Sequence, residues 1–395
     1  MQQVKKSDKL ANMVADFVGC EAGRVSLFYK GRVALYAILK SIGIAAGDEV
    51  VLPAYTCVVV PNVIKYLGAN PKYVDIELPT FSVAPEDLIA AIGPRTKAVI
   101  CQNTYGLSWG VDKVSSYCRD VGVKTIEDCT HGFGGYYHGR PNGSYCDAAF
   151  YSSQWNKPFS TGLGGYSVAS DTDLGERIST FAGTLPLPSL KTRTILWGLL
   201  KSRSLVTPRT YYTLVEVYRY LSKRNLVTGS SSGEELDGTT MPVDYLRSMS
   251  GVQVRAGLKS LKKLANQNEI RKTNGARYTD FLKSAGYNHV SPNLHADHLF
   301  LKYPLLVSNR NEFKERARKA GVPLGDWFLS PLHPIETDLS PWDFDTARYP
   351  QASFAGAHVV NLPTDTSLIE PVIAFLKNNS ELILPLNHKE ENNHG

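Results

Sequence analysis

Short apolar runs alternate with helical patterns through the first half of the chain. β-Branched and aliphatic residues predict strands at 49–52, 72–75, 98–101, 124–127 and 148–151. Apolar residues at helical spacing lie between most of these runs, and one helix is expected to begin at Gly31. Strands that alternate with helices form a mostly parallel sheet. The pattern therefore predicts an α/β fold whose ligands bind beyond the carboxyl ends of the strands.

The pattern changes to longer helices after Met241. Apolar residues at helical spacing continue from Val252 to Leu282, a strand is expected within 298–307, and helices are expected at 310–320 and around 373–376. We expect a large domain over 1–245 and a smaller C-terminal α+β domain over 246–395. The last residues, from 387 onward, are expected to be disordered.

A basic helical insertion is expected at 185–240, where prolines interrupt helical stretches. Between residues 191 and 224 there are eight Lys or Arg residues and one acid, Glu216. Leu214, Val217 and Leu221 recur at helical spacing, and 229–233 is expected to be a mobile loop. Such an element most often packs on its own domain or on a dimer partner. Peripheral membrane contact through 191–224, or closure over an anionic substrate, stays open as an alternative.

Composition excludes several classes of protein. The chain of 395 residues is 43% apolar and 20% charged, and its net charge of +6 is spread without a basic block interleaved with aromatics, which excludes nucleic-acid binding. The six cysteines lack CxxC spacing, so we expect no metal site and a reducing compartment. The N-terminus lacks the apolar stretch of a signal peptide, and no uninterrupted span is long enough to cross a bilayer. We therefore expect a cytoplasmic protein.

A lysine and an aspartate carry the candidate chemistry. Asp128 ends the strand predicted at 124–127, and Lys157 lies between the strand at 148–151 and the glycine-rich segment 162–165. A pyridoxal phosphate (PLP) enzyme needs this pair: the lysine amine forms a Schiff base with the cofactor aldehyde, and the aspartate keeps the pyridine nitrogen protonated. Gly31 and Arg32, at the start of a helix, are candidates for the phosphate, although Gly31 is also explained as a break and Arg32 as a surface charge.

Several motifs together resemble the DegT/DnrJ/EryC1/StrS family of PLP-dependent sugar aminotransferases, from about Ser26 to Leu376. The motifs are Gly31-Arg32-Val33-Ala34-Leu35, Gly47-Asp48-Glu49-Val50-Val51-Leu52-Pro53, Glu127-Asp128-Cys129-Thr130-His131-Gly132, Ser152-x4-Lys157-x4-Gly162-x-Gly164-Gly165, and Met249-Ser250 with Gln253. The resemblance implies the fold-type I architecture of aspartate aminotransferase.

The resemblance also implies roles for individual residues. Lys157 would bind the cofactor covalently, Asp128 would pair with the pyridinium, and His131 would bond near the ring hydroxyl; a purely structural role for His131 stays open. Ser152 and the backbone of 31–33, including Val33, would hold the phosphate.

The chain departs from the family pattern at four places. Arg32 replaces the usual Thr, and Leu163 replaces the Glu of GEGG. Cys57 stands where many relatives carry an aromatic that stacks on the cofactor, which makes Tyr55 a candidate substitute. The Asn-Tyr-Arg before Met-Ser, whose Asn in relatives reaches the partner's cofactor phosphate, reads Leu246-Arg247-Ser248.

The function that the resemblance implies is ping-pong transamination through a Lys157 aldimine. The amino group would pass from L-glutamate to a nucleotide-linked keto-sugar, in cell-surface polysaccharide or secondary-metabolite biosynthesis, and the enzyme would be a homodimer. Two alternatives stay open: another PLP reaction on a non-sugar substrate, such as β-elimination, and a regulatory homologue without turnover.

Overall fold

The computed structural model describes residues 2–203, 210–223, 227, 231 and 233–386. Most of the loop expected at 229–233 and the whole tail at 387–395 lie outside the described residues. None of the described helices combines the length and the apolar character that crossing a bilayer demands.

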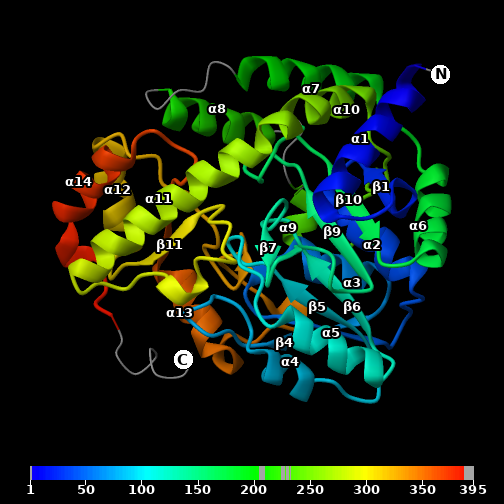
Figure 1. Cartoon of the computed structure of the whole chain (residues 1–395), viewed down its shortest axis with the longest axis horizontal. Helices are drawn as coiled ribbons and strands as arrows, with labels where there is room; N and C mark the ends of the chain where they lie inside the picture. Colours follow the sequence, from blue (N-terminus) through cyan, green and yellow to red (C-terminus); the bar gives the residue numbers. More distant parts are fainter. Residues whose placement is uncertain (1, 204–209, 224–226, 228–230, 232, 387–395) are drawn as a thin grey trace.

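A seven-stranded sheet lies at the centre of the molecule (Figure 1), in the order β1-β10-β9-β6-β5-β2-β4. Its strands are β1 (Val25–Phe28), β2 (Glu49–Pro53), β4 (Asn70–Val74), β5 (Thr96–Gln102), β6 (Lys124–Asp128), β9 (Ala148–Ser152) and β10 (Gly165–Ala169). β4, β2, β5, β6 and β9 are parallel neighbours, whereas β10 is antiparallel to both β9 and β1. The five predicted strands all exist, and the mostly parallel α/β fold is confirmed.

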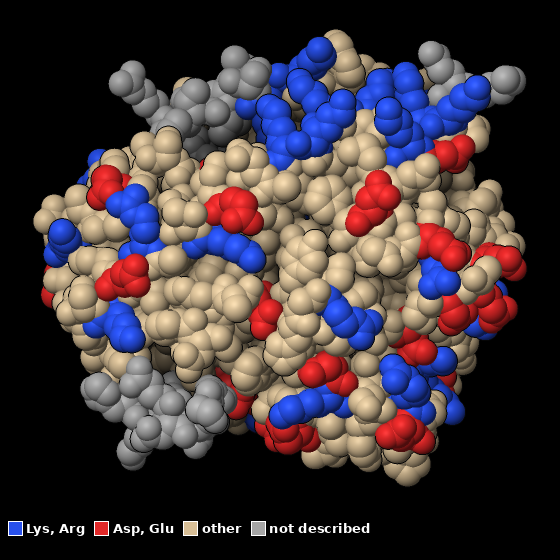
Figure 2. Space-filling model, in the orientation of Figure 1, with Lys and Arg blue, Asp and Glu red and all other residues tan. Residues whose placement is uncertain are grey.

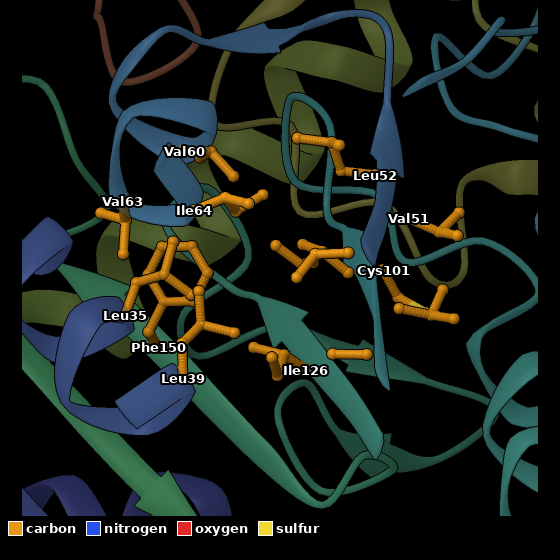
Figure 3. Close-up of a cluster of buried hydrophobic side chains, with 14 of the residues drawn as sticks. Leu35, Leu39, Val51, Leu52, Val60, Val63, Ile64, Cys101, Ile126 and Phe150 are labelled. Carbon is orange, nitrogen blue, oxygen red and sulfur yellow. The ribbon is translucent and has the colours of Figure 1, made fainter. Parts of the chain in front are cut away.

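Helices cover the sheet because their apolar faces match its buried side chains. These helices are α2 (Gly31–Ser41), α3 (Val59–Tyr66), α4 (Pro85–Ala90), α5 (Val111–Asp120) and α6 (Thr172–Thr184). Figure 3 shows Leu35 and Leu39 of α2 beside Phe150 of β9, with Ile64 of α3 close by. Burial of each such side chain contributes about 1.5–3 kcal/mol. This packing fixes the start of α2 beside the carboxyl ends of β9 and β6.

Three helices occupy the segment between the sheet and the C-terminal part: α7 (Leu190–Ser202), α8 (Tyr211–Lys223) and α9 (Gly233–Asp237). α7 and α8 lie along the upper edge in Figure 1. α8 covers the helical pattern predicted from Leu214 to Leu221.

The C-terminal part has its own apolar cluster, which includes Tyr278, Leu305 and Phe375. Its elements are α10 (Gly251–Ser260), α11 (Leu264–Ser284), β11 (Tyr303–Leu306), α12 (Arg310–Lys319), β12 (Leu332–His333), α13 (Pro350–His358), β13 (Val359–Leu362) and α14 (Ile369–Lys377). The strand expected over 298–307 shortens to β11, because Phe300 has φ of 53° and breaks the extended backbone. The domain boundary between 245 and 246 remains a prediction.

Several contacts join the C-terminal part to the first half of the chain, and two involve paired secondary-structure elements. β12 pairs in parallel with β3 (Thr56–Cys57), so that His333 lies opposite Cys57. α1 (Gln2–Val18) packs on α10, and Leu10 shares an apolar cluster with Val254. A short hairpin, β7 (Tyr136–Tyr137) and β8 (Arg140–Pro141), completes the described strands.

Candidate active site

Lys157 lies in a turn just after β9, where its backbone N–H donates to Gln154 O at 3.1 Å. Burial lowers the pKa of its amine from 10.5 to about 8, while the carboxylate of Asp128 opposes the shift. The Nζ atom is 4.2 Å from the centre of the Trp327 indole. A lysine with such a pKa is partly neutral near physiological pH and can accept or release a proton.

Asp128 ends β6 and is 4% exposed. The Thr130 N–H donates to its Oδ1 at 3.0 Å. Burial raises the pKa of this carboxyl group, whereas Thr130 and Lys157 lower it. Glu127 points to the opposite face of the strand, where its Oε1 accepts from Asn103 Nδ2 at 3.2 Å. Asp128 is therefore the member of the acidic pair that interacts electrostatically with the buried Lys157.

His131 is buried and stacks on Trp327, with ring centres 4.7 Å apart and an interplanar angle of 5°. Its Nδ1 accepts from the Tyr105 backbone N–H at 3.2 Å, so the other ring nitrogen carries the proton in the neutral form. Burial holds the pKa of His131 well below its usual value, and the charge of Lys157 lowers it further. His131 thus presents a neutral imidazole beside Lys157.

The start of α2 is packed closely against the ends of β9 and β10. A Cβ atom on Gly31 would lie 3.0 Å from Ser152 Cβ, and one on Gly165 would lie 2.4 Å from Gly31 N. Glycine is therefore required at Gly165, a side chain at Gly31 would press on Ser152, and Ser152 is held beside the first turn of the helix. Val33 uses its N–H within that turn, where it donates to Lys30 O at 3.1 Å.

Arg32 is 7% exposed and forms an ion pair with Glu235 of α9. Its two terminal nitrogens also donate to Ser231 Oγ, each at 3.2 Å. Lys30 Nζ lies 3.9 Å from the other Glu235 oxygen, and burial lowers the pKa of this lysine to about 8. Lys30 and Arg32 thus share the buried Glu235 carboxylate at the start of α2, and Asp244 also acts on the charge of Lys30.

The structure separates the two candidates for the ring-stacking position. Tyr55 is fully buried, and its hydroxyl group contacts that of Tyr105 at 2.8 Å, behind the pocket. Cys57 is half-buried and lies within electrostatic range of Arg32, Lys157 and Asp128. Burial raises the pKa of its thiol. Both residues stay candidates: Cys57 lies near the charged groups of the site, whereas the Tyr55 hydroxyl is taken up by Tyr105.

Leu163 is 1% exposed and packs under α7, in one cluster with Leu196 and Tyr29. A Cβ atom on Gly162 would lie 2.7 Å from Leu196 Cδ1. Gln253 of α10 holds the same loop, since its Nε2 donates to Leu163 O at 2.5 Å and to Tyr29 O at 3.0 Å. The replacement of the family's Glu by Leu163 is explained by this apolar contact with α7.

The Leu246–Ser248 segment lies beside the end of β1. The Tyr29 N–H donates to Arg247 O at 3.1 Å, and Ser248 forms a bridge with Phe28. These contacts fix the backbone just before α10.

Two residues of the site, Trp327 and Glu235, escaped the sequence analysis. Trp327 is held beside His131 by residues distant in sequence, because its N–H donates to Asn361 Oδ1 at 2.7 Å and its O accepts from the Tyr105 hydroxyl at 2.8 Å. Glu235 follows a Gly- and Ser-rich segment, where a solvated acid is the usual expectation. The sequence Trp327-Phe328, with its two adjacent aromatics before Pro331, was the one available sign.

The residues of this pocket fit PLP. Gly31 and Gly165 pack closely, so only backbone groups and the Ser152 side chain lie at the start of α2. Backbone N–H groups at a helix start, with the basic Arg32 beside them, suit a phosphate. A lysine with a lowered pKa and a buried carboxylate lie on the other side, which suits the aldehyde and the ring nitrogen.

The chain belongs to the DegT/DnrJ/EryC1/StrS aminotransferase family, whose model matches residues 1–191 and 213–373. Its class is therefore that of the aminotransferases. The family model leaves 192–212 unmatched, which includes most of α7.

Two relatives illustrate the family. The UDP-2-acetamido-2-deoxy-3-oxo-D-glucuronate aminotransferase of Pseudomonas aeruginosa is 25% identical over 94% of this chain and 89% of its own length. The GDP-perosamine synthase of Escherichia coli O157:H7 is 35% identical, but the match covers 39% of this chain and 42% of the synthase.

Solved structures share the fold. The aminotransferase TlmJ from Streptoalloteichus hindustanus matches with a TM-score of 0.71 and 22% identity, over 95% of this chain and 92% of that one. A Streptococcus pneumoniae protein solved in its PLP form matches with a TM-score of 0.71 and 18% identity, over 95% and 91%. The fold is thus that of the fold-type I aminotransferases, as the resemblance implied.

Proposed function

We propose that this protein is a PLP-dependent aminotransferase that moves an amino group from L-glutamate to a nucleotide-linked keto-sugar. The observation that carries the proposal is the Lys157 amine, whose pKa burial lowers to about 8, in one pocket with the buried Asp128. A sugar acceptor is supported by the relative whose name contains a UDP-linked 3-oxo sugar. Cell-surface polysaccharide or secondary-metabolite biosynthesis is the corresponding setting.

Each residue of the pocket has a defined task. PLP, when bound, supplies an aldehyde that condenses with amines and a ring that withdraws electrons from the amine-bearing carbon. Lys157 Nζ holds the cofactor and then carries the proton from the α-carbon of the donor, for which a pKa of about 8 is well suited. Asp128 stabilises the positive charge on the ring nitrogen, and His131 orients the ring through its neutral imidazole. Gly31, Ser152 and Arg32 hold the phosphate, with Cys57 beside them.

The two half-reactions use the same lysine. The keto acid left from the donor departs before the sugar enters, and Lys157 then returns a proton to the carbon that receives the amine. This order gives ping-pong kinetics, because the first product leaves before the second substrate binds.

The test is the absorption spectrum of the protein with PLP, before and after addition of L-glutamate. We expect a long-wavelength band from lysine-bound PLP that disappears with glutamate and persists with the D-isomer. A Lys157→Ala variant should lack the band, whereas Lys283→Ala, which removes an exposed lysine, should keep it. A band that ignores glutamate and other amino donors would favour a different PLP reaction, and a band without turnover on any acceptor would favour the regulatory alternative.

We also infer a homodimer in the cytoplasm. All six cysteines are free thiols, which suits a reducing compartment. The dimer rests on the family resemblance, in which active sites draw residues from both chains. Light scattering after size-exclusion chromatography should give twice the chain mass of 43.5 kDa. A monomer with full activity would contradict this part of the proposal.

A further inference from the structure

One edge of the molecule exposes large apolar side chains beside basic ones. α7 turns Leu196 inward, whereas Leu190 is 73% exposed and Trp197 is 53% exposed. Thr194 and Lys201 lie on the same outer stripe, at four and eleven residues from Leu190. Exposed aromatic and aliphatic side chains on one stripe are costly in water and usually mark a binding surface.

The charge of this edge has one sign. Residues 185–203 and 249–268, the two segments that contain α7 and α10, have eight basic residues and no Asp or Glu. Figure 2 shows Lys and Arg side chains gathered along the edge where Figure 1 places these two helices. Arg203 is turned inward, with Nη2 3.5 Å from Trp155 O. The remaining basic groups give the edge a positive potential that attracts anions.

A hollow of about 360 Å³ lies between α7 and α10. It is lined by Leu190, Arg193 and Trp197 from α7 and by Gly251, Val252 and Arg255 from α10. Within the described part of the chain, neither arginine forms an ion pair, and Arg193 Nε is buried without a hydrogen-bond partner. Gly251 and Val252 are the first residues of α10, whose positive end therefore borders the same space. Two guanidinium groups and a helix start suit a phosphate.

We propose that the α7–α10 edge binds the surface of a membrane that contains anionic phospholipids. A lipid phosphate occupies the hollow between Arg193 and Arg255, and Leu190 and Trp197 lie at the boundary between headgroups and acyl chains. The family model leaves most of α7 unmatched, which agrees with a task outside the shared reaction.

The observations favour a membrane over two other occupants. A soluble phosphorylated ligand could bind in the hollow, but it would leave Leu190 at the rim exposed to water. A second copy of this chain, in a symmetric contact, would bring two surfaces of the same positive sign together, which is unfavourable. An anionic membrane leaflet offers both an apolar layer for Leu190 and Trp197 and negatively charged headgroups for the arginines.

The test is co-sedimentation of the full-length protein with phosphatidylcholine vesicles that contain or lack phosphatidylglycerol. We expect binding to the anionic vesicles at low salt and loss of binding at high salt. The double variant Arg193→Gln/Arg255→Gln should reduce the partition coefficient by about 30-fold, because each basic residue contributes about fivefold at such a surface and the two factors multiply. Trp197→Ser should also weaken binding to the anionic vesicles at low salt, because it removes apolar contact and leaves the charges unchanged.

The control is Lys97→Gln/Lys283→Gln, which removes the same charge from two exposed lysines on other elements. It should bind anionic vesicles as the unchanged protein does. All variants are compared by thermal melting, so a fall in binding is attributed to the surface only when the melting temperature is unchanged.

Three results would overturn the proposal. One is the absence of enrichment on anionic vesicles at low salt. The second is equal loss of binding in the control variant. The third is that the arginine substitutions abolish binding of a soluble nucleoside diphosphate, or abolish self-association, while vesicle binding is absent or unaffected. Loss of nucleoside diphosphate binding would assign the hollow to a free phosphate ligand, and loss of self-association would assign it to a second copy.

Discussion

Glu235 forms a buried ion pair with Arg32 at the start of α2, and the same carboxylate lies 3.9 Å from Lys30 Nζ. Glu235 is 2% exposed, and its backbone O accepts from Asn62 Nδ2 of α3 at 2.8 Å. A segment some 200 residues downstream of α2 thus supplies the counter-ion for the cations beside the proposed phosphate site.

Glu235→Gln should destabilise the fold. The change leaves the Arg32 guanidinium buried without its anion, which costs about 3 kcal/mol. Glu234→Gln, one position earlier and exposed, should change the free energy of unfolding by less than about 0.5 kcal/mol. Denaturant unfolding of both variants tests this, and equal stability of the two would contradict it.

Capture of PLP should depend on pH through Lys157. Its neutral amine is the reactive form, so the rate should rise about tenfold per pH unit below the pKa of about 8 and level off above it. Stopped-flow absorbance measures this rate. Lys30 has a similar lowered pKa, so Lys30→Gln is the control: it should keep the same pH profile, and a profile that shifts in this variant instead would assign the titration to Lys30.

The same lysine should make the fold more stable as pH rises. Its folded-state pKa of about 8 lies below the unfolded value of 10.5, so the unfolded chain binds more protons between these values. Stability therefore rises across pH 8 to 10.5 by the contribution of this group. Lys157→Met should flatten that rise in denaturant unfolding, and an unchanged slope would show that the shift is compensated elsewhere.

Gly165→Ala should damage the phosphate cradle. Its Cβ atom would lie 2.4 Å from Gly31 N and Lys30 O, so β10 and α2 would have to separate. We expect PLP affinity to fall by at least about tenfold, because the helix start is displaced. Gly183→Ala in α6 meets no atom within 4 Å and should leave affinity unchanged. Fluorescence titration with PLP separates the two outcomes.

Leu163→Glu should be unfavourable, although it restores the residue usual in the family. The carboxylate would be buried under Leu196 of α7, which costs about 3 kcal/mol or forces α7 to move. Leu163→Met preserves the volume and should cost less than about 1.5 kcal/mol. Calorimetric melting distinguishes them, and a stable Glu variant would mean that α7 is only loosely held.

Local patterns predicted the elements that bring Lys157 and Asp128 together. The alternation of strands and helices gave β6, β9 and the start of α2, and parallel strands place their carboxyl ends at one edge. The hydrophobic periodicity of strands and helices depends on residues that are close together in the chain, so it can be recognised in the sequence itself.

Long-range contacts could not be predicted in the same way. Trp327 depends on hydrogen bonds with Asn361 and Tyr105, and Glu235 depends on the charge of Arg32, all of which are contacts between residues distant in sequence. The choice between Tyr55 and Cys57 was open as well, because a shift of two residues keeps a side chain on the same face of a strand. In the structure the Tyr55 hydroxyl contacts that of Tyr105, whereas Cys57 lies within electrostatic range of Lys157 and Asp128, and the stacking role of either residue stays a prediction.

α7 touches the glycine loop with one face and exposes the other. Leu196 rests on Leu163 a few residues after Lys157, while Trp197, its neighbour, points to the outside. Any ligand that favours one position of α7 changes the free energy of the loop beneath it, and if that ligand changes the affinity for the cofactor, thermodynamic reciprocity requires the cofactor to change the affinity for that ligand by the same factor. Binding at the outer edge and binding of the cofactor at the proposed site would therefore be coupled through this one helix.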